Sequence, residues 1–498
     1  MCRLGLAAVW RFVDKVNAGI GMRKESMPIQ PTTGRNLCGL LIVALALSAC
    51  GGGGDGSGYM PPSSPTMSPP SPTPPPAPTP VTGQQLSGTI TGLIGSGLVL
   101  QVNTTYSLTI PANSTSFAFS TSIADGGSYS IAVTTQPSSP LQNCVVNNAT
   151  GTVGAGAANI TVACSAVELV YTQEVVGAAG SSSITQYELN ESTGALILST
   201  IGVDGLVPNG IGATHDGKFV YASTIDEIDN FAVAAGSGTF AQVGFIAAGT
   251  KPAIPTVDPT NRFLYAADQG ANSILEFSID SSTGNLTAMG SFTTPATPYA
   301  IAINPAGTFA YATTSSSILV LSIDATSGAL AQVGSVSITG NSGSVFPVID
   351  PNDMFLYASI ANANSASAYG VNAGTGNLTS ISSVATGTGP SVAVINPAGT
   401  FLYVANIASN DISEFAIDAV TGALVAGTTT PGPPNIGIPG IQAIAIDPSG
   451  NFLVATSVNV DSVYTIDQAT GALTLASSTQ TGGGDNISPV GVVVTPAP

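Results

Sequence analysis

The sequence predicts an all-β protein, in which a seven-bladed β-propeller follows a small β-sandwich. The first observation is an internal repeat of about 46 residues that fills the last two thirds of the chain. The second is a set of short alternating apolar and polar segments, separated by Gly and Ser turns, in front of that repeat. The third is the composition, with 58 Gly, 35 Pro and only 7% charged residues among 498.

Residues 1–49 have the pattern of an export signal. An apolar run from Leu37 to Ala49 follows the basic Arg35 and is too short to span a bilayer as a helix. The segment before about Met22 or Met27 is longer than a signal requires, which favours a later start codon. We therefore expect residues 1–49 to be removed on export.

The end of this run, Leu47-Ser48-Ala49-Cys50, resembles the lipobox of bacterial lipoproteins. The resemblance implies that Cys50 is acylated and becomes the first residue of a protein anchored in the lipid bilayer. It also implies passage to the outer membrane of the bacterial cell envelope, because Gly51 rather than Asp follows the Cys. The alternative is an ordinary signal peptide that happens to contain a Cys.

The charge balance argues against nucleic acid as a partner. The formal net charge is −18, and Lys218, Lys251 and Arg262 are the only Lys or Arg residues after the signal region. Binding to phosphate-rich polymers requires clustered basic side chains, which this chain lacks.

Residues 50–83 are rich in Gly, then in Pro and Ser, and such a composition cannot bury a core. We expect a lipidated, extended linker that holds the folded part away from the membrane.

Residues 84–164 read as a small β-sandwich. The expected strands are Thr89–Leu93, Leu98–Val102, Ser107–Ile110, Phe117–Phe119 and Tyr129–Val133. Cys144 and Cys164 are the only cysteines after Cys50, and in an exported protein they predict a disulfide that contributes about 3 kcal/mol. The pattern resembles the immunoglobulin-like and prealbumin-like modules of bacterial surface lipoproteins.

Residues 165–498 contain two alternating motifs. Asn304-Pro305-Ala306-Gly307-Thr308-Phe309-Ala310-Tyr311 represents the first, and Ile417 to Leu424, with its Thr-Gly pair, represents the second. Asx-Pro-x-Gly suits a type I turn, and Phe-x-Tyr places two aromatic side chains on one strand face, where they can pack into the next blade.

The ends of the repeat region predict how the ring closes. The first repeat begins at Leu169, already in its second strand, and the last segment, Pro489 to Pro496, has the spacing of an inner strand. A C-terminal strand that completes the first blade would remove both sheet edges. We therefore expect seven blades.

The segments Phe401–Asn406 and Ile412–Leu424 resemble the lactonase-type seven-bladed propellers, including 6-phosphogluconolactonase-like and carboxymuconate-cyclase-like proteins, and are related to the YVTN-repeat propellers. The resemblance implies ring opening near the central channel by a general base, with a cation or metal that stabilises the oxyanion. It also implies a His, Glu and Arg set in the cyclases, for which no matching positions occur here.

Candidate site residues are few. His215, Lys218 and Arg262 flank Asx-Pro turns, and Lys251 alone precedes an inner strand on the opposite face. A single cation is a poor phosphate clamp, which argues against a phosphorylated lactone.

Acidic and amide side chains form a second set of candidates. Asp226, Glu227, Asp229 and Asp268 are candidates for proton transfer or for a site that holds Ca²⁺ or Mg²⁺, against the alternative of solvated surface acids. Asn406 and Asp411, with Lys251, are candidates for a polar rim that contacts a ligand.

These observations favour a membrane-anchored lipoprotein whose propeller binds a protein partner or small ligand without catalysis and needs no cofactor. The alternative is a lactone hydrolase that uses loop carboxylates, with or without a divalent metal. Lactone turnover, and its loss in Asp226→Ala or Asp268→Ala, would separate the two hypotheses.

Overall fold

The computed structural model describes residues 83–138, 140–154, 159–176, 181–206, 209–338, 343–432, 440–481 and 488–498. Apart from one 3₁₀ turn, η1 (Ala361–Ala363), every regular element in these ranges is a β-strand. Within them, no helix has the length and apolar character needed to cross a membrane. The signal region, Cys50 and the linker lie outside the described residues, so their roles remain predictions.

The first folded part consists of two four-stranded sheets, with strand orders β4-β1-β8-β6 and β3-β2-β5-β7. The strands are β1 (Gly83–Thr91), β2 (Val99–Val102), β3 (Tyr106–Thr109), β4 (Ser116–Ala124), β5 (Ser128–Thr135), β6 (Gln142–Asn147), β7 (Thr150–Thr152) and β8 (Ile160–Ala166). Alternate side chains point inward, as Phe117 and Phe119 do, with ring centroids 5.8 Å apart in an edge-to-face contact. The predicted sandwich is therefore present.

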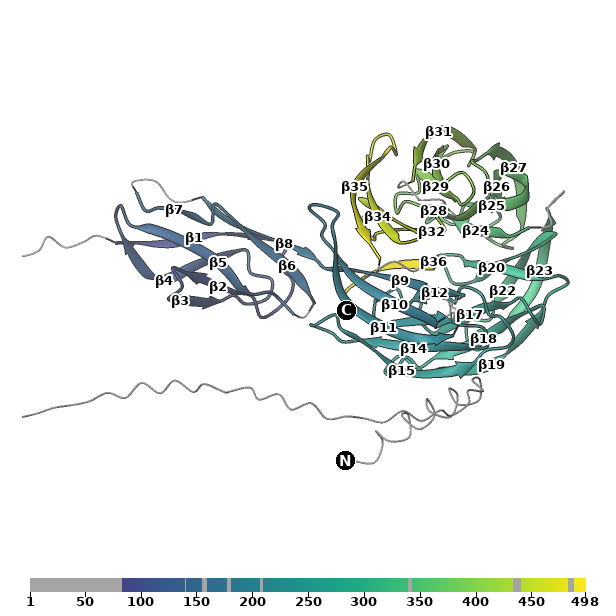
Figure 1. The fold of residues 1–498 in the computed structure, drawn as a ribbon, viewed down its shortest axis with the longest axis horizontal. Helices are drawn as coiled ribbons and strands as arrows, with labels where there is room; N and C mark the ends of the chain where they lie inside the picture. The colour runs from purple at the N-terminus through teal and green to yellow at the C-terminus, as the bar shows by residue number, and fades with distance from the viewer. Residues whose placement is uncertain are drawn as a thin grey trace, which may run out of the picture. The chain divides into compact units, whose positions relative to one another are not determined.

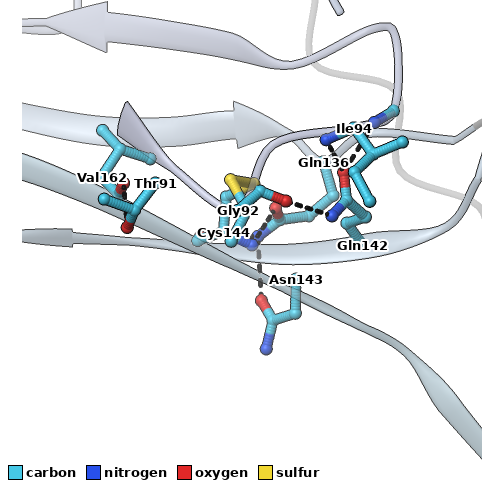
Figure 2. The surroundings of a disulfide bond; sticks show 10 residues. Thr91, Gly92, Ile94, Gln136, Gln142, Asn143, Cys144 and Val162 are labelled. Carbon is cyan, nitrogen blue, oxygen red and sulfur yellow. Dashed lines mark hydrogen bonds between the residues drawn. A yellow bond between two sulfur atoms is a disulfide. The ribbon is translucent and has the colours of Figure 1, made fainter. Parts of the chain in front are cut away.

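Cys144 and Cys164 form a disulfide between β6 and β8, where they are directly opposite each other (Figure 2). Two amide side chains, the buried Gln142 and the exposed Gln136, fix the segments around it. Gln142 Nε2 donates to the Gly92 carbonyl over 2.8 Å, and Gln136 Oε1 accepts from the Cys144 N–H over 2.8 Å. The disulfide and these amides connect the loop after β1 to the edge of the same sheet.

Seven four-stranded antiparallel sheets follow, and each is one blade of the propeller. Blade 1 contains β36 (Ser488–Pro496), β9 (Glu168–Val176), β10 (Ser181–Leu189) and β11 (Leu196–Leu206); blade 2 contains β12 (Gly210–Ala213), β13 (Phe219–Ser223), β14 (Glu227–Val233) and β15 (Phe240–Ala247). Blade 3 contains β16 (Thr256–Val257), β17 (Phe263–Asp268), β18 (Ser273–Ile279) and β19 (Leu286–Thr293); blade 4 contains β20 (Pro298–Ile303), β21 (Phe309–Thr314), β22 (Ser317–Ile323) and β23 (Leu330–Ser337). Blade 5 contains β24 (Val345–Ile349), β25 (Phe355–Ile360), β26 (Ser365–Val371) and β27 (Leu378–Ala385); blade 6 contains β28 (Pro390–Ile395), β29 (Phe401–Asn406), β30 (Asp411–Ile417) and β31 (Leu424–Pro431). Blade 7 contains β32 (Ala443–Ile446), β33 (Phe452–Ser457), β34 (Val460–Ile466) and β35 (Leu473–Gln480).

The C-terminal strand closes the ring. β36 is antiparallel to β9, with Val493 opposite Tyr171, and so supplies the inner strand of blade 1 (Figure 1). The inner strands contact one another in an unbroken cycle, β12, β16, β20, β24, β28, β32 and β36, and β36 returns to β12. The predicted seven-bladed fold is confirmed.

The two repeated motifs form the turns that the sequence predicts. At the Asx-Pro turn of blade 3, Asp258 Oδ1 accepts from the backbone N–H groups of Arg262 and Phe263 over 2.7 and 2.6 Å. In the Thr-Gly hairpin of the same blade, hydrogen bonds from the Ser282 side chain and from backbone N–H groups lower the pKa of Asp280 to about 2. These bonds satisfy the turn backbone locally, which is why the same motifs recur from blade to blade.

The same motifs also join neighbouring blades. The Phe263 ring of blade 3 packs against Gly328 in the hairpin of blade 4, where a Cβ atom would lie 2.5 Å from ring atom Cδ1. Two residues later, the Tyr265 hydroxyl donates to the Gly328 carbonyl over 2.7 Å. Equivalent tyrosine-to-glycine hydrogen bonds join Tyr221 to Gly284, Tyr357 to Gly422 and Tyr403 to Gly471. Each Phe-x-Tyr segment therefore holds the hairpin of the next blade.

Candidate functional site

The loops of the propeller fall on two faces because its strands are antiparallel. Asx-Pro turns and Thr-Gly hairpins share one face, here called the turn face. Loops that precede the inner strands and loops between the second and third strands share the other, here called the loop face.

The loop face contains a cavity of about 440 Å³ at the mouth of the central channel, within the size range of small-molecule sites. Its walls come from blades 2 to 7. The lining residues are Asn209, Ala253, Ile254, Gln269, Tyr299, Ser344, Phe346, Ala361, Gly389, Pro390, Ser391, Val392, Ile407, Ala408 and Gln442.

Two aromatic side chains lie on adjacent inner strands of this cavity. Tyr299 is the second residue of β20 and Phe346 is the second residue of β24, and both are half-buried. Gln269 follows β17 of blade 3 and adds an amide, and Ser344 precedes β24 of blade 5 and adds a hydroxyl. The cavity therefore offers both apolar ring faces and groups that donate and accept hydrogen bonds.

Hydroxyl groups at and near the cavity join neighbouring blades. The Thr313 hydroxyl donates to the Val345 carbonyl of the next blade over 2.6 Å, and the Ser391 hydroxyl donates to the Gln442 carbonyl over 3.1 Å. Asn209 Nδ2 spans a third junction, 2.6 Å from the Pro252 carbonyl. Inner strands of different blades share no ladder, so these bonds fix the shape of the cavity wall.

None of the described residues that line the cavity carries a charge. A neutral wall provides no clamp for a phosphate or carboxylate group and no carboxylate to act as a general base. The arrangement suits an uncharged ring-shaped molecule with hydroxyl or carbonyl groups.

Asp268, a predicted catalytic and metal-binding candidate, instead holds a loop in place. It is 1% exposed, and its carboxylate accepts from the backbone N–H groups of Thr250, Gly270 and Ala271 over 3.1, 3.1 and 3.3 Å. These bonds give the carboxylate a structural role in the loop, with most of them made by Oδ1.

The other predicted carboxylates differ in how far they are exposed to solvent. Asp226 is exposed and Glu227 is half-buried at the start of β14. Asp229 is 2% exposed inside blade 2, where it accepts from Gln242 Nε2 over 2.6 Å. Among the described residues, no three His, Cys, Asp or Glu side chains come close enough to hold a metal ion.

The predicted polar rim is also placed differently. Asn406 is fully buried, with Nδ2 2.7 Å from Asp411 Oδ1 and 2.9 Å from the Ser413 hydroxyl. Asp411 lines a separate recess of about 190 Å³ in blade 6, and Lys251 is exposed outside the cavity lining. Asn406 is buried because β29 turns its last side chain into the blade interior, and the rim itself stays a prediction.

The cations and the histidine of the turn face have structural contacts. The Lys218 ammonium pairs with Asp216 at 2.8 Å, and the His215 backbone N–H donates to Asn261 Oδ1. The Arg262 guanidinium donates to the Ala325 carbonyl of the next blade over 2.7 Å. These contacts match the turn-flanking roles that their positions suggest.

The sequence reasoning missed the residues that line the cavity. Tyr299 and Phe346 lie outside the Phe-x-Tyr motif, near the start of neighbouring inner strands. The available signal was an aromatic residue near the start of each of these two strands.

Comparison with known proteins places the propeller in a family. The family model described as lactonase, 7-bladed beta-propeller, matches residues 181–298, 245–347, 301–438 and 383–489, which together exceed half of the chain. A search of curated proteins found no match.

Solved structures share this fold at low sequence identity. A presumed 6-phosphogluconolactonase from Bacteroides fragilis is 22% identical, with a TM-score of 0.56 over 66% of this chain and 98% of that one. One from Bacteroides uniformis is 20% identical, with a TM-score of 0.58 over 66% and 99%. The periplasmic gluconolactonase of Pseudomonas aeruginosa is 14% identical, with a TM-score of 0.57 over 67% and 100%.

These structures are similar in fold alone, whereas the family model matches the repeated sequence itself. The chain therefore belongs to the lactonase family of seven-bladed β-propellers.

Proposed function

We propose that this protein is a lipid-anchored lipoprotein of the bacterial cell envelope whose propeller binds an uncharged small molecule in the loop-face cavity. The observation that carries the proposal is the cavity itself, whose described lining residues come from six blades and include no charged side chain. Binding requires no cofactor in this proposal, because amide, hydroxyl and aromatic groups supply the contacts.

Anchoring is the part of the proposal that rests on sequence. The lipobox-like segment ending at Cys50 supports acylation of that residue and placement in the outer membrane. Intact-mass measurement of the membrane-extracted protein tests it: acylation of Cys50 adds the mass of lipid chains, and Cys50→Ser abolishes the addition. An unmodified mass in the wild-type protein would contradict anchoring.

A thermal-shift screen tests ligand binding. The purified protein is heated with uncharged sugar lactones and polyols and, separately, with their phosphorylated or carboxylated counterparts. A ligand at 100 times its Kd stabilises the folded state by about 2.7 kcal/mol, which such a screen detects. The proposal predicts shifts with uncharged compounds only.

A matched pair of variants locates the site. Tyr299→Ala removes an aromatic wall of the cavity, whereas Tyr106→Ala removes a 53% exposed tyrosine from the sandwich. The ligand shift should disappear in the first variant and persist in the second. A shift that survives Tyr299→Ala would place binding elsewhere.

Lactone hydrolysis is the second candidate, and membership of the lactonase family favours it. In that case a carboxylate at the loop face would act as general base, and Asp226 and Asp268 are the predicted residues. Asp268→Asn keeps most of the loop hydrogen bonds while removing the charge, and Asp226→Ala changes an exposed residue. Lactone turnover that is lost in either variant, or on chelation of divalent metals, would establish hydrolysis over simple binding.

A further inference from the structure

The junction between blade 7 and blade 1, where the ring closes, differs from the other six junctions in its buried residues. Asp461 lies on β34, three residues before Tyr464, at a position that is apolar in every other blade. The equivalent residues are Ile184, Ile228, Ile274, Ile318, Ala366 and Ile412, all 0% or 1% exposed.

Asp461 is as deeply buried as those apolar residues. Its exposed fraction is 0%, and neither carboxyl oxygen has a hydrogen-bond partner at ordinary geometry. The groups that face it from blade 1 are the Glu174 carboxyl and the Tyr187 hydroxyl, both acids themselves. Glu174 is 3% exposed and accepts from the Thr172 hydroxyl over 3.2 Å.

A second group of acids lies at the other end of β9. Glu168 is 4% exposed and faces Asp447 of the blade 7 turn and Glu191 of the blade 1 hairpin. In the other six blades the residue before the motif Phe is exposed; these residues are Lys218, Arg262, Thr308, Met354, Thr400 and Asn451. The burial of an acid at this position is specific to the closing junction.

No basic side chain compensates these acids among the described residues of blades 7 and 1. The three Lys and Arg residues of the folded region lie in or beside blades 2 and 3. Carboxyl groups that are buried together without a cation cannot all be ionised, because desolvation and mutual repulsion both disfavour the charged form. The folded ring therefore retains protons here that the unfolded chain releases.

We propose that the propeller closes through protonated carboxyl groups at the junction of blades 7 and 1, so that rising pH loosens this junction before the others. This pH response depends neither on the ligand site nor on catalysis. It makes the seam that joins the N- and C-terminal strands of the ring the pH-sensitive part of the fold.

The direction of the effect follows from proton binding. Burial raises the pKa of Glu174 to about 7, and burial with Asp447 and Glu191 nearby raises the pKa of Glu168 to about 8, from the ordinary 4.5. Between the ordinary pKa of 4.5 and the raised pKa in the folded state, the folded protein binds more protons than the unfolded chain. The stability contributed by these groups is therefore fully present below pH 4.5 and is lost as pH rises to about 8. Each glutamate lowers the folding equilibrium constant by roughly tenfold per pH unit within its window.

Urea denaturation of the purified protein from pH 4 to pH 9 tests the proposal. Wild-type stability should fall through this range, and the nearly isosteric Glu168→Gln and Glu174→Gln variants, combined, should flatten the fall. Asp226→Asn, a change at an exposed acid, should leave the pH profile unchanged and serves as the control. A double variant as pH-sensitive as the wild type would overturn the proposal.

Two further readouts place the effect in the structure. Hydrogen exchange, corrected for its intrinsic pH dependence, should increase at pH 9 in β9 and β34 more than in β21 and β22 of blade 4. Asp461→Ile, which introduces the residue of the other blades, should raise stability most at high pH. Uniform opening of all blades at pH 9 would refute a junction-specific device, even if Asp461→Ile fails to fold.

Discussion

The glycine of the Thr-Gly hairpin provides a sharp test of how the blades are held together. Gly376, in blade 5, has φ +70, and a Cβ atom there would lie 2.6 Å from Cδ1 and 2.8 Å from Cγ of Phe309 in blade 4. The ring is rigid and packed between two blades, so it has little freedom to move away. Gly376→Ala should therefore strain the backbone and overpack the interface together.

The magnitude follows from these two terms. A non-glycine residue in the left-handed region costs about 1–2 kcal/mol, and overpacking a filled interface costs about 1–3 kcal/mol more. We expect Gly376→Ala to lower the free energy of unfolding by about 2–5 kcal/mol. The assay is urea denaturation followed by circular dichroism, with the slope of the transition compared between variants.

The same hairpin contains its own control. Gly374 precedes Gly376 by two residues, and a Cβ atom there would meet only Asn372 Oδ1, at 3.6 Å. Gly374→Ala should be neutral or stabilise by up to about 1 kcal/mol, because it restricts the unfolded chain. A loss below about 0.5 kcal/mol in Gly376→Ala, or equal losses in both variants, would refute the packing argument.

Two further predictions concern single contacts. Tyr265→Phe leaves the buried Gly328 carbonyl without its 2.7 Å hydrogen bond and should lower the free energy of unfolding by about 1–3 kcal/mol in urea denaturation. Tyr311→Phe should cost much less, because the Tyr311 hydroxyl is buried without a partner. A larger loss in Tyr311→Phe than in Tyr265→Phe would contradict this reasoning. Replacing Cys144 and Cys164 together by serine should lower the free energy of unfolding by about 3 kcal/mol, because the disulfide restricts the unfolded chain. Thermal denaturation of the wild type with and without reductant measures the same contribution. An unchanged midpoint would show that the disulfide contributes little.

The fold could be predicted from the sequence because its determinants are local and repeated. Asn396 and Thr400, for example, close a turn through hydrogen bonds within one motif, and the Phe401 ring then packs on the hairpin glycine of the next blade. Such a turn forms from residues that are close in the sequence, so it can be recognised without knowing which distant residues it contacts. Six copies of this turn and seven hairpin glycines at a regular spacing therefore predict both the strands and their number.

The cavity could not be predicted in the same way. Its lining takes one or a few residues from each of six blades, at positions outside both motifs, and their proximity appears only once the ring closes. Burial of single side chains was also not visible in the sequence. Asn406 and Asp268 look like loop residues in the sequence, but they end strands whose last side chain points into the blade.

The buried acids at the junction of blades 7 and 1 could be predicted only in part. Asp461 is visible in the sequence as a break in an otherwise apolar repeat position. Its meaning depends on Glu174 and Tyr187, which are far away in the chain and meet it only because β36 pairs with β9. Repeat comparison therefore finds the anomaly, and the closed ring explains it.

The most direct test of the proposed function is titration calorimetry of the purified protein with an uncharged sugar lactone and with its phosphorylated counterpart, with hydrolysis followed in parallel at constant pH. The cavity described here predicts binding of the uncharged compound, loss of that binding in Tyr299→Ala, and no measurable binding of the phosphorylated one. Tighter binding of the phosphorylated compound, or hydrolysis that depends on Asp226 or Asp268, would contradict the account of a neutral binding site.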